Sequence, residues 1–163
     1  MTQKKVGIQK DISNLNLSIS KSQKSELLFS IIIPTFNRAK LLKRALDSII
    51  TQTISNWEII VIDNYSNDGT KELIDTYSNY NIKYYLFNNE NIIAKSRNFG
   101  CKIAIGKFIA FLDSDDWWDR SKLFHIQKNY QIKPNIDLVY HNCFFVNSKK
   151  IIKKSNCRKL RSN

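Results

Sequence analysis

The sequence predicts an α/β fold with a mostly parallel sheet flanked by helices. Two observations predict it. From residue 27 onwards, short apolar runs alternate with amphipathic stretches, and strands that alternate with helices form βαβ units with parallel strands. The chain has 163 residues, of which 42% are hydrophobic and 12% aromatic, enough for one domain with a real core.

The first half of the chain contains two strands and two helices by this reading. The first strand covers 28–33, and we expect Pro34 to stop it because proline cannot donate to a ladder. The stretch 38–51 has its apolar residues on one helical face. A second strand covers 57–62, and a helix follows over 70–77.

The second half continues the alternation. We expect strands at 82–87, 108–112 and 136–140, the last continued at 144–146, and helices at 92–105 and 120–130.

The charge is concentrated at the two ends. The net charge is +12, of which residues 1–25 contribute +4 and residues 149–163 contribute +7. We therefore expect a polar, basic leader at 1–26, a domain at 27–148 and a basic tail at 149–163. The basic ends are either simply solvated or attracted to an anionic membrane surface. Nucleic-acid binding ranks lowest, because the body has no basic stripe.

The compartment follows from what the sequence lacks. No apolar run is long enough to span a bilayer, and no secretory signal stands at the N-terminus. The three cysteines, Cys101, Cys143 and Cys157, lack C-x-x-C spacing and are typical of reduced thiols. His141 and Cys143 have no second pair to complete a metal site. We expect a cytoplasmic protein, with contact at the inner face of the plasma membrane through its basic ends.

An acidic cluster follows the strand expected at 108–112. Asp113, Asp115 and Asp116 are three carboxylates within four residues, and like charges this close repel unless a cation lies among them. Carboxylate oxygens suit Mg²⁺ and Mn²⁺, which bind through one or two carboxylates and substrate phosphates. The pattern predicts a metal–diphosphate site. A solvated acidic turn is the alternative, and it would be preferred for an isolated D-x-D.

Two more polar clusters follow the strands at 28–33 and 57–62. Because the carboxyl ends of parallel strands meet at one edge, we expect one ligand crevice there. Asp63 is placed to bind a base imide or a ribose hydroxyl. Thr35 and Asp68 are equally well explained by contact with a ligand or by a structural role in a loop. The simplest role of Arg38 is to start the helix.

Further candidates flank the acidic cluster. Arg97, on the helix before it, could neutralise a diphosphate or pair with an aspartate, or lie on the surface. Trp117 and Trp118 could stack on a sugar ring or belong to the core, and at most one is expected to face the ligand.

Taken together, these motifs resemble the family 2 glycosyltransferases of GT-A fold. The resemblance covers about residues 28–140 in the family's order. It is carried by the segments FSIIIPTFNR (29–38), WEIIVID (57–63), DGT (68–70), AKSRNFG (94–100) and FLDSDD (111–116).

The resemblance implies a nucleotide-sugar donor, usually a UDP-sugar, and a divalent metal, Mn²⁺ or Mg²⁺. It implies that Thr35 and Asp63 hold the nucleoside and that Arg97 lies beside the donor. Asn64 stands where many members have a second aspartate. The expected nucleotide-sugar-binding residues are Pro34, Thr35, Asn37, Asp63, Asp68, Arg97, Asp113 and Ser114, and the expected metal ligands are Asp113 and Asp115.

Family members continue into an acceptor-binding half that supplies the general base. The catalytic base of this chain is therefore unknown, and Asp137 is expected to be structural. The implied function is inverting transfer of a sugar to a glycan or lipid-linked acceptor in surface polysaccharide or lipopolysaccharide-type biosynthesis. The alternative is a truncated, non-catalytic nucleotide-sugar-binding remnant, or a half that needs a partner. We expect this chain to bind donor and metal but to transfer poorly alone.

Overall fold

The computed structural model describes residues 27–135, 137–139, 141–146 and 151–155. The chain divides into two compact units, with the boundary between Arg120 and Ser121. The predicted leader at 1–26 and most of the predicted basic tail at 149–163 lie outside the described residues. Within them, no helix is both long and apolar enough to cross a membrane.

The first unit is built on a four-stranded sheet. Its strands are β1 (Phe29–Thr35), β2 (Trp57–Asp63), β3 (Ile82–Leu86) and β4 (Phe108–Phe111). They lie in the order β3-β2-β1-β4, and every neighbouring pair is parallel. The α/β fold with a parallel sheet is therefore confirmed.

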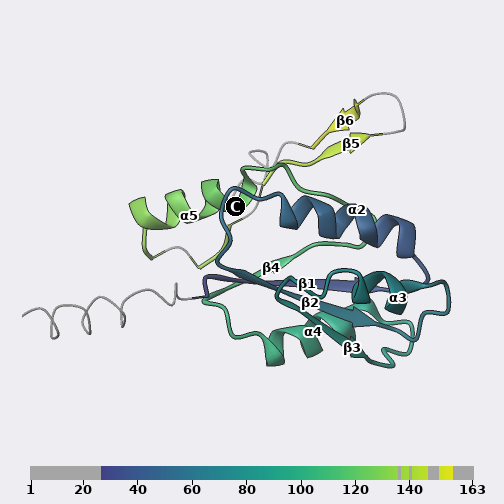
Figure 1. Cartoon of the computed structure of the whole chain (residues 1–163). Coiled ribbons are helices and arrows are strands. Elements are labelled where there is room, and N and C mark those ends of the chain that lie inside the picture. The colour runs from purple at the N-terminus through teal and green to yellow at the C-terminus, as the bar shows by residue number, and fades with distance from the viewer. Residues whose placement is uncertain (1–26, 136, 140, 147–150, 156–163) are drawn as a thin grey trace, which may run out of the picture. The chain divides into compact units, whose positions relative to one another are not determined.

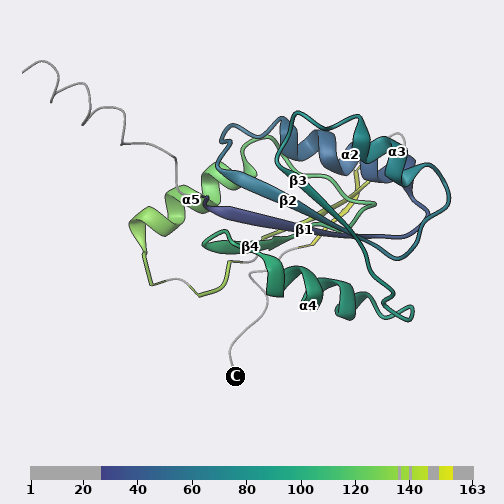
Figure 2. The same cartoon turned by 60° about the horizontal axis from the view of Figure 1, so that its bottom comes forward.

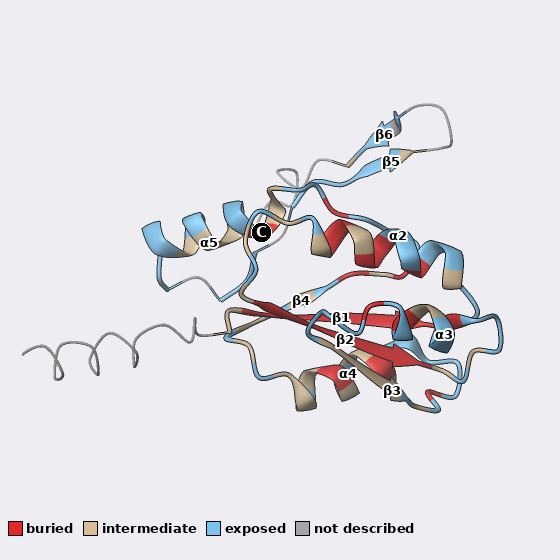
Figure 3. Ribbon diagram, in the orientation of Figure 1, coloured by how far each residue is buried: buried red, intermediate tan, exposed pale blue. Residues whose placement is uncertain are grey.

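Helices cover both faces of this sheet. Helix α2 (Ala39–Ile50) and helix α3 (Thr70–Asp75) lie on one face, and helix α4 (Ile93–Ile103) lies on the other (Figures 1 and 2). The two central strands are buried along their whole length (Figure 3). This explains why their sequences are nearly continuous apolar runs instead of alternating ones.

The core beneath α4 is formed by isoleucines of the central strands and aromatic side chains. Ile32, Ile60 and Ile62 are fully buried and pack against Tyr85, Phe87, Phe99, Cys101, Ile103 and Ala104. Gly100 allows the helix to approach, because a Cβ at this position would lie 2.6 Å from the Ile32 side chain. This close contact fixes α4 over β1, the strand that leads into the polar edge.

Strand β1 continues through Pro34, so the prediction that proline stops the strand is wrong. β4 ends at Phe111, which is opposite Ile32. Pro34 lies beyond that point, so its missing N–H removes no hydrogen bond from the β1–β4 ladder. On the other side, β2 pairs with β1 as far as Thr35 and Asp63.

The second unit contains helix α5 (Lys122–Ile132) and the antiparallel strands β5 (Phe144–Val146) and β6 (Ile151–Lys154). The strand expected at 136–140 is wrong for the described residues 137–139, which have no regular structure. A strand requires a neighbouring strand to pair its backbone N–H and C=O groups. Among the described residues of this unit, strand pairing joins β5 to β6 and does not include 137–139.

Candidate functional site

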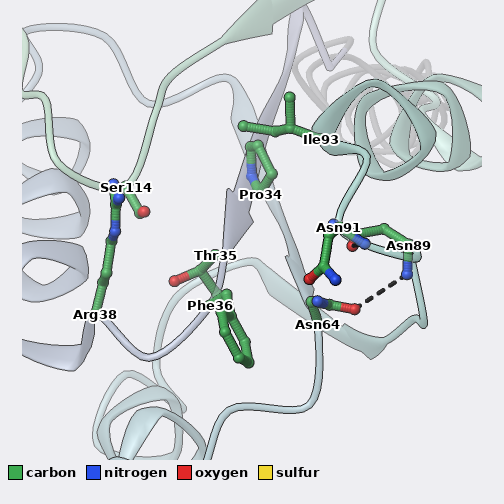
Figure 4. Close-up of a pocket in the computed structure, with 9 residues that line it drawn as sticks. All are labelled: Pro34, Thr35, Phe36, Arg38, Asn64, Asn89, Asn91, Ile93 and Ser114. Carbon is green, nitrogen blue, oxygen red and sulfur yellow. Dashed lines mark hydrogen bonds between the residues drawn. The ribbon is translucent and has the colours of Figure 1, made fainter.

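A cavity of about 220 Å³ opens at the carboxyl edge of the parallel sheet. Figure 4 shows Arg38 and Ser114 on one side of it and three asparagines on the other. Ligands bind at this edge in open α/β sheets. The residues that line the cavity are Pro34, Thr35, Phe36, Arg38, Asn64, Asn89, Asn91, Ile93 and Ser114.

Thr35, the last residue of β1, has a hydroxyl without a partner. The residue is only 5% exposed, and its Oγ1 makes no hydrogen bond. The oxygen points towards the side of the cavity on which Arg38 and Ser114 lie (Figure 4). Buried hydroxyls are nearly always hydrogen-bonded, so Thr35 Oγ1 is available to a polar group that enters the cavity.

The acidic segment after β4 is held by arginines. The Arg97 guanidinium donates to Asp113 Oδ1 at 2.6 Å, and the Arg38 guanidinium donates to Asp115 Oδ2 at 2.5 Å. Arg44 donates to the backbone carbonyl of Asp115. Both carboxylates remain about half exposed, with side-chain exposures of 42% for Asp113 and 45% for Asp115. The two aspartates are therefore accessible from the solvent and are balanced by positive charge.

These two carboxylates fit a hard divalent cation as a partial ligand set. Among the described residues, no group of three or more His, Cys, Asp or Glu side chains could hold a metal ion. A cation at Asp113 and Asp115 would therefore need further oxygen ligands, which a substrate diphosphate can supply. The donor set suits Mg²⁺ or Mn²⁺ better than a thiophilic metal.

Asp63, at the end of β2, is fully buried. Its Oδ1 accepts hydrogen bonds from the Ser66 hydroxyl at 2.5 Å and the Ser66 N–H at 3.1 Å, and its Oδ2 accepts one from the Tyr84 hydroxyl at 2.5 Å. Burial, together with the bond to Asp63, raises the pKa of Tyr84. Asp63 does not line the cavity, so its observed contacts hold the loop that follows β2 against β3.

Asp68 has a structural use that accounts for its position. It accepts a hydrogen bond from the Ala39 N–H at 2.8 Å at the start of α2, and one from the Thr70 hydroxyl at 2.6 Å. Burial acts to raise the pKa of Asp68, but these hydrogen bonds outweigh it and leave the pKa below its ordinary value. The carboxylate thus satisfies a free N–H at a helix N-terminus.

Asn37 and the tryptophans also make internal contacts. The Asn37 N–H donates to the Ser66 hydroxyl, and its side-chain oxygen accepts from the Asn67 N–H. Trp118 is buried, whereas Trp117 is 44% exposed and packs under the Arg44 guanidinium, whose carbon lies 4.1 Å from the ring centroid. Of the two tryptophans, Trp117 is the exposed one, and a ligand contact by it stays a prediction.

The sequence did not identify the asparagine side of the cavity. Asn64 Oδ1 accepts the Asn89 N–H at 3.0 Å, Asn89 donates to the Ser96 hydroxyl at 2.9 Å, and Asn89 Oδ1 accepts the Asn91 N–H at 2.9 Å. This chain of bonds links the end of β2 to the loop before α4. The asparagines within 88–91 were the sequence feature that could have indicated this side of the cavity, but by themselves they predict only a loop.

Three comparisons with known proteins place this geometry in a family. Residues 30–156 match the family model for "Glycosyl transferase family 2". The chain is 36% identical over 129 residues to the Escherichia coli UDP-Glc:alpha-D-GlcNAc-diphosphoundecaprenol beta-1,3-glucosyltransferase WfgD, covering 79% of this chain and 51% of that protein. It is 34% identical over 99 residues to the Bacillus subtilis putative teichuronic acid biosynthesis glycosyltransferase TuaG, covering 59% and 39%.

Among solved structures, S. aureus TarS 1-349 superposes with a TM-score of 0.61 at 32% identity, covering 64% of this chain and 32% of that one. TarS 1-349 has also been crystallised with UDP and with UDP-GlcNAc. The chain spans about half the length of the E. coli relative and smaller shares of the others. The matched residues include all four strands of the sheet and the whole cavity edge, and the chain belongs to glycosyl transferase family 2.

Proposed function

We propose that this chain carries the donor site of an inverting glycosyltransferase that uses a nucleotide-diphospho-sugar, specifically a UDP-sugar. The acceptor is a glycan or lipid-linked glycan of surface polysaccharide synthesis. The observation that carries the proposal is the buried, unpartnered Thr35 hydroxyl, which lines a cavity flanked by Arg38 and the acidic segment. Relatives named for UDP-sugar transfer and for UDP complexes support this choice of donor.

The residues divide the work between the two ends of the donor. Thr35 and the cavity asparagines supply neutral hydrogen-bonding groups, which suit a nucleoside. Arg38 and Arg97 supply guanidinium groups that match phosphate oxygens. A divalent cation at Asp113 and Asp115 would supply Lewis-acid stabilisation of the diphosphate leaving group. Inverting transfer further requires a base that deprotonates the acceptor hydroxyl.

Nucleotide-sugar binding by Asp63, Asp68 and Asn37 stays a prediction of the same proposal. The hydrogen bonds described above support it only indirectly, because through them these residues shape the loops behind the cavity. For location, we propose the cytoplasmic face of the plasma membrane, because a lipid-linked acceptor would be found there. The basic ends would supply attraction to anionic lipid, and vesicle binding that ignores salt would contradict that attraction.

The first test is a thermal-shift titration of the whole chain with UDP, with and without Mn²⁺. A ligand that binds only the native state raises the melting temperature. We expect a shift with UDP that grows when Mn²⁺ is added. No shift with either ligand, in a chain that melts cooperatively, would contradict the proposed donor site.

A matched pair of variants locates the site. Asp115→Asn should weaken metal-dependent UDP binding far more than Asp119→Asn, because Asp115 is an expected metal ligand and forms the ion pair with Arg38, which lines the cavity. Equal effects of the two changes would contradict the placement of the site. Sugar transfer by the purified chain, measured with a UDP-sugar and a lipid-linked acceptor, separates an enzyme from a protein that only binds the donor.

A further inference from the structure

Each carboxylate expected to hold the cation is already paired with an arginine. Asp113 pairs with Arg97 of α4 at 2.6 Å, and Asp115 pairs with Arg38, which precedes α2, at 2.5 Å. The two arginines come from different elements on opposite faces of the sheet (Figure 1). Two independent elements therefore supply positive charge at the position where a cation would add more.

Arg38 takes part in two environments at once. Its guanidinium holds Asp115, and its side chain also lines the cavity that contains the unpartnered Thr35 hydroxyl (Figure 4). Both members of the Arg38–Asp115 pair are about half exposed, at 49% and 45%. An ion pair this exposed is weak and can exchange partners at little cost.

We propose that Arg38 is an exchangeable counterion of the donor site. In the structure it neutralises Asp115. When a nucleoside diphosphate enters with its cation, Arg38 transfers to the diphosphate oxygens and the cation takes its place at Asp115. Arg97 acts in the same way at Asp113, with less freedom because its Nε is buried. This inference rests on the proposed donor site and adds how that site couples its two ligands.

The exchange predicts coupled binding of metal and nucleotide. A cation alone must displace a guanidinium, which leaves the guanidinium without a partner. A diphosphate provides that partner, so each ligand favours the other, and the coupling must be reciprocal. Arg38 then contacts the diphosphate directly, and its effect is on the coupling between the two ligands.

The experiment measures Mn²⁺ binding by electron paramagnetic resonance and UDP binding by calorimetry on the whole chain, each with and without the other ligand. Values are corrected for the Mn²⁺–UDP complex that forms in solution. For the parent chain, we expect UDP to tighten Mn²⁺ binding by roughly 5- to 150-fold, the usual range of coupling between sites. For Arg38→Met, we expect tighter binding of Mn²⁺ alone, weaker binding of UDP and a smaller coupling.

Lys40→Met is the matched control. It removes the same charge two residues from Arg38, and Lys40 is an exposed residue of α2. We expect its binding of Mn²⁺ alone and its coupling to stay close to those of the parent. Equal behaviour of the two variants would overturn the exchange while leaving the donor site intact. Failure of the parent to bind UDP at all would contradict the donor site itself, and the exchange with it.

Discussion

Strand β2 has a buried acid near its start and another at its end, and its two ends have different roles. At the amino edge, Glu58 is fully buried. Its Oε1 accepts hydrogen bonds from the Ser30 hydroxyl at 2.5 Å and the Ile105 N–H at 3.0 Å, and its Oε2 lies 2.7 Å from the Lys83 ammonium. One side chain thus joins β1, β2, β3 and the segment that leads into β4.

The carboxyl edge shows the opposite features. It contains the unpartnered Thr35 hydroxyl, half-exposed arginine–aspartate pairs and a cavity. The positive backbone φ angles of described non-glycine residues also occur in its loops, at Asn37, Tyr65, Glu90 and Asn91. Strained backbone and unpaired polar groups persist only where the surrounding structure holds them in place, and they are concentrated at ligand-binding sites. The amino edge stabilises the sheet, and the carboxyl edge is free to bind.

The largest effect should come from Glu58→Ala. It leaves the Ser30 hydroxyl and the Ile105 N–H without their shared acceptor, each at a cost of about 1–3 kcal/mol. It also removes the ion-pair partner of the Lys83 ammonium, whose side chain is 34% exposed. Urea unfolding measures the loss. The control is Glu90→Ala, because Glu90 pairs with Lys95 at the surface and is 69% exposed, so that about 1 kcal/mol or less is expected. Similar losses for both variants would remove the contrast between the edges.

A somewhat smaller loss of stability is expected for Gly106→Ala. A Cβ there would lie 2.6 Å from the Ser30 backbone nitrogen and 2.7 Å from the Phe29 carbonyl carbon. Overpacking of this kind costs about 1–3 kcal/mol. Thermal unfolding tests it against Ile105→Ala, whose side chain is 69% exposed. UDP binding by the folded variant should equal that of the parent, and a selective loss of UDP binding would contradict the separation of the two edges.

Thr35→Val should have the reverse profile. The hydroxyl makes no hydrogen bond within the protein, so its removal should leave the free energy of unfolding unchanged or slightly higher. The hydrogen bond to the ligand is lost, which is worth about 0.5–1.5 kcal/mol, or roughly 2- to 10-fold in UDP affinity. Calorimetry with UDP measures this, and Thr35→Ser, which retains the hydroxyl, should bind as the parent does. If valine binds as well as serine, the ligand does not use this hydroxyl.

The smallest effect should appear in the free energy of unfolding at acidic pH. Burial acts to raise the pKa of Glu58, but Lys83, Ser30 and the Ile105 N–H outweigh it, so its pKa in the folded protein lies below the ordinary 4.5. Its contribution is therefore complete above pH 4.5 and is lost as the pH falls through the lower, folded-state pKa. The stability difference between the parent and Glu58→Gln should shrink on acidification. A difference that stays constant down to full protonation would contradict this linkage.

Local sequence patterns were enough to predict the fold class, the order of the four parallel strands along the chain and the polar segments that follow them. These features depend on local patterns, because buried strands and amphipathic helices have their own periodicities. The acidic segment, Thr35 and Arg97 could be identified because they directly follow or flank such elements. Asp63 was correctly placed at a strand end, but its partners Ser66 and Tyr84 could not be foreseen, since Tyr84 belongs to another strand.

The pairing of distant polar groups became visible in the three-dimensional structure and could not be predicted from local sequence. Arg38 precedes Asp115 by 77 residues, and Glu58 joins groups that lie 28 and 47 positions away. The missing strand at 137–139 and the continued strand at Pro34 have the same cause, because a strand depends on neighbours that the local sequence does not specify. Local sequence decides what each segment can form, and the packing of distant segments decides whether a charged group is held in a closed network or left open to a ligand.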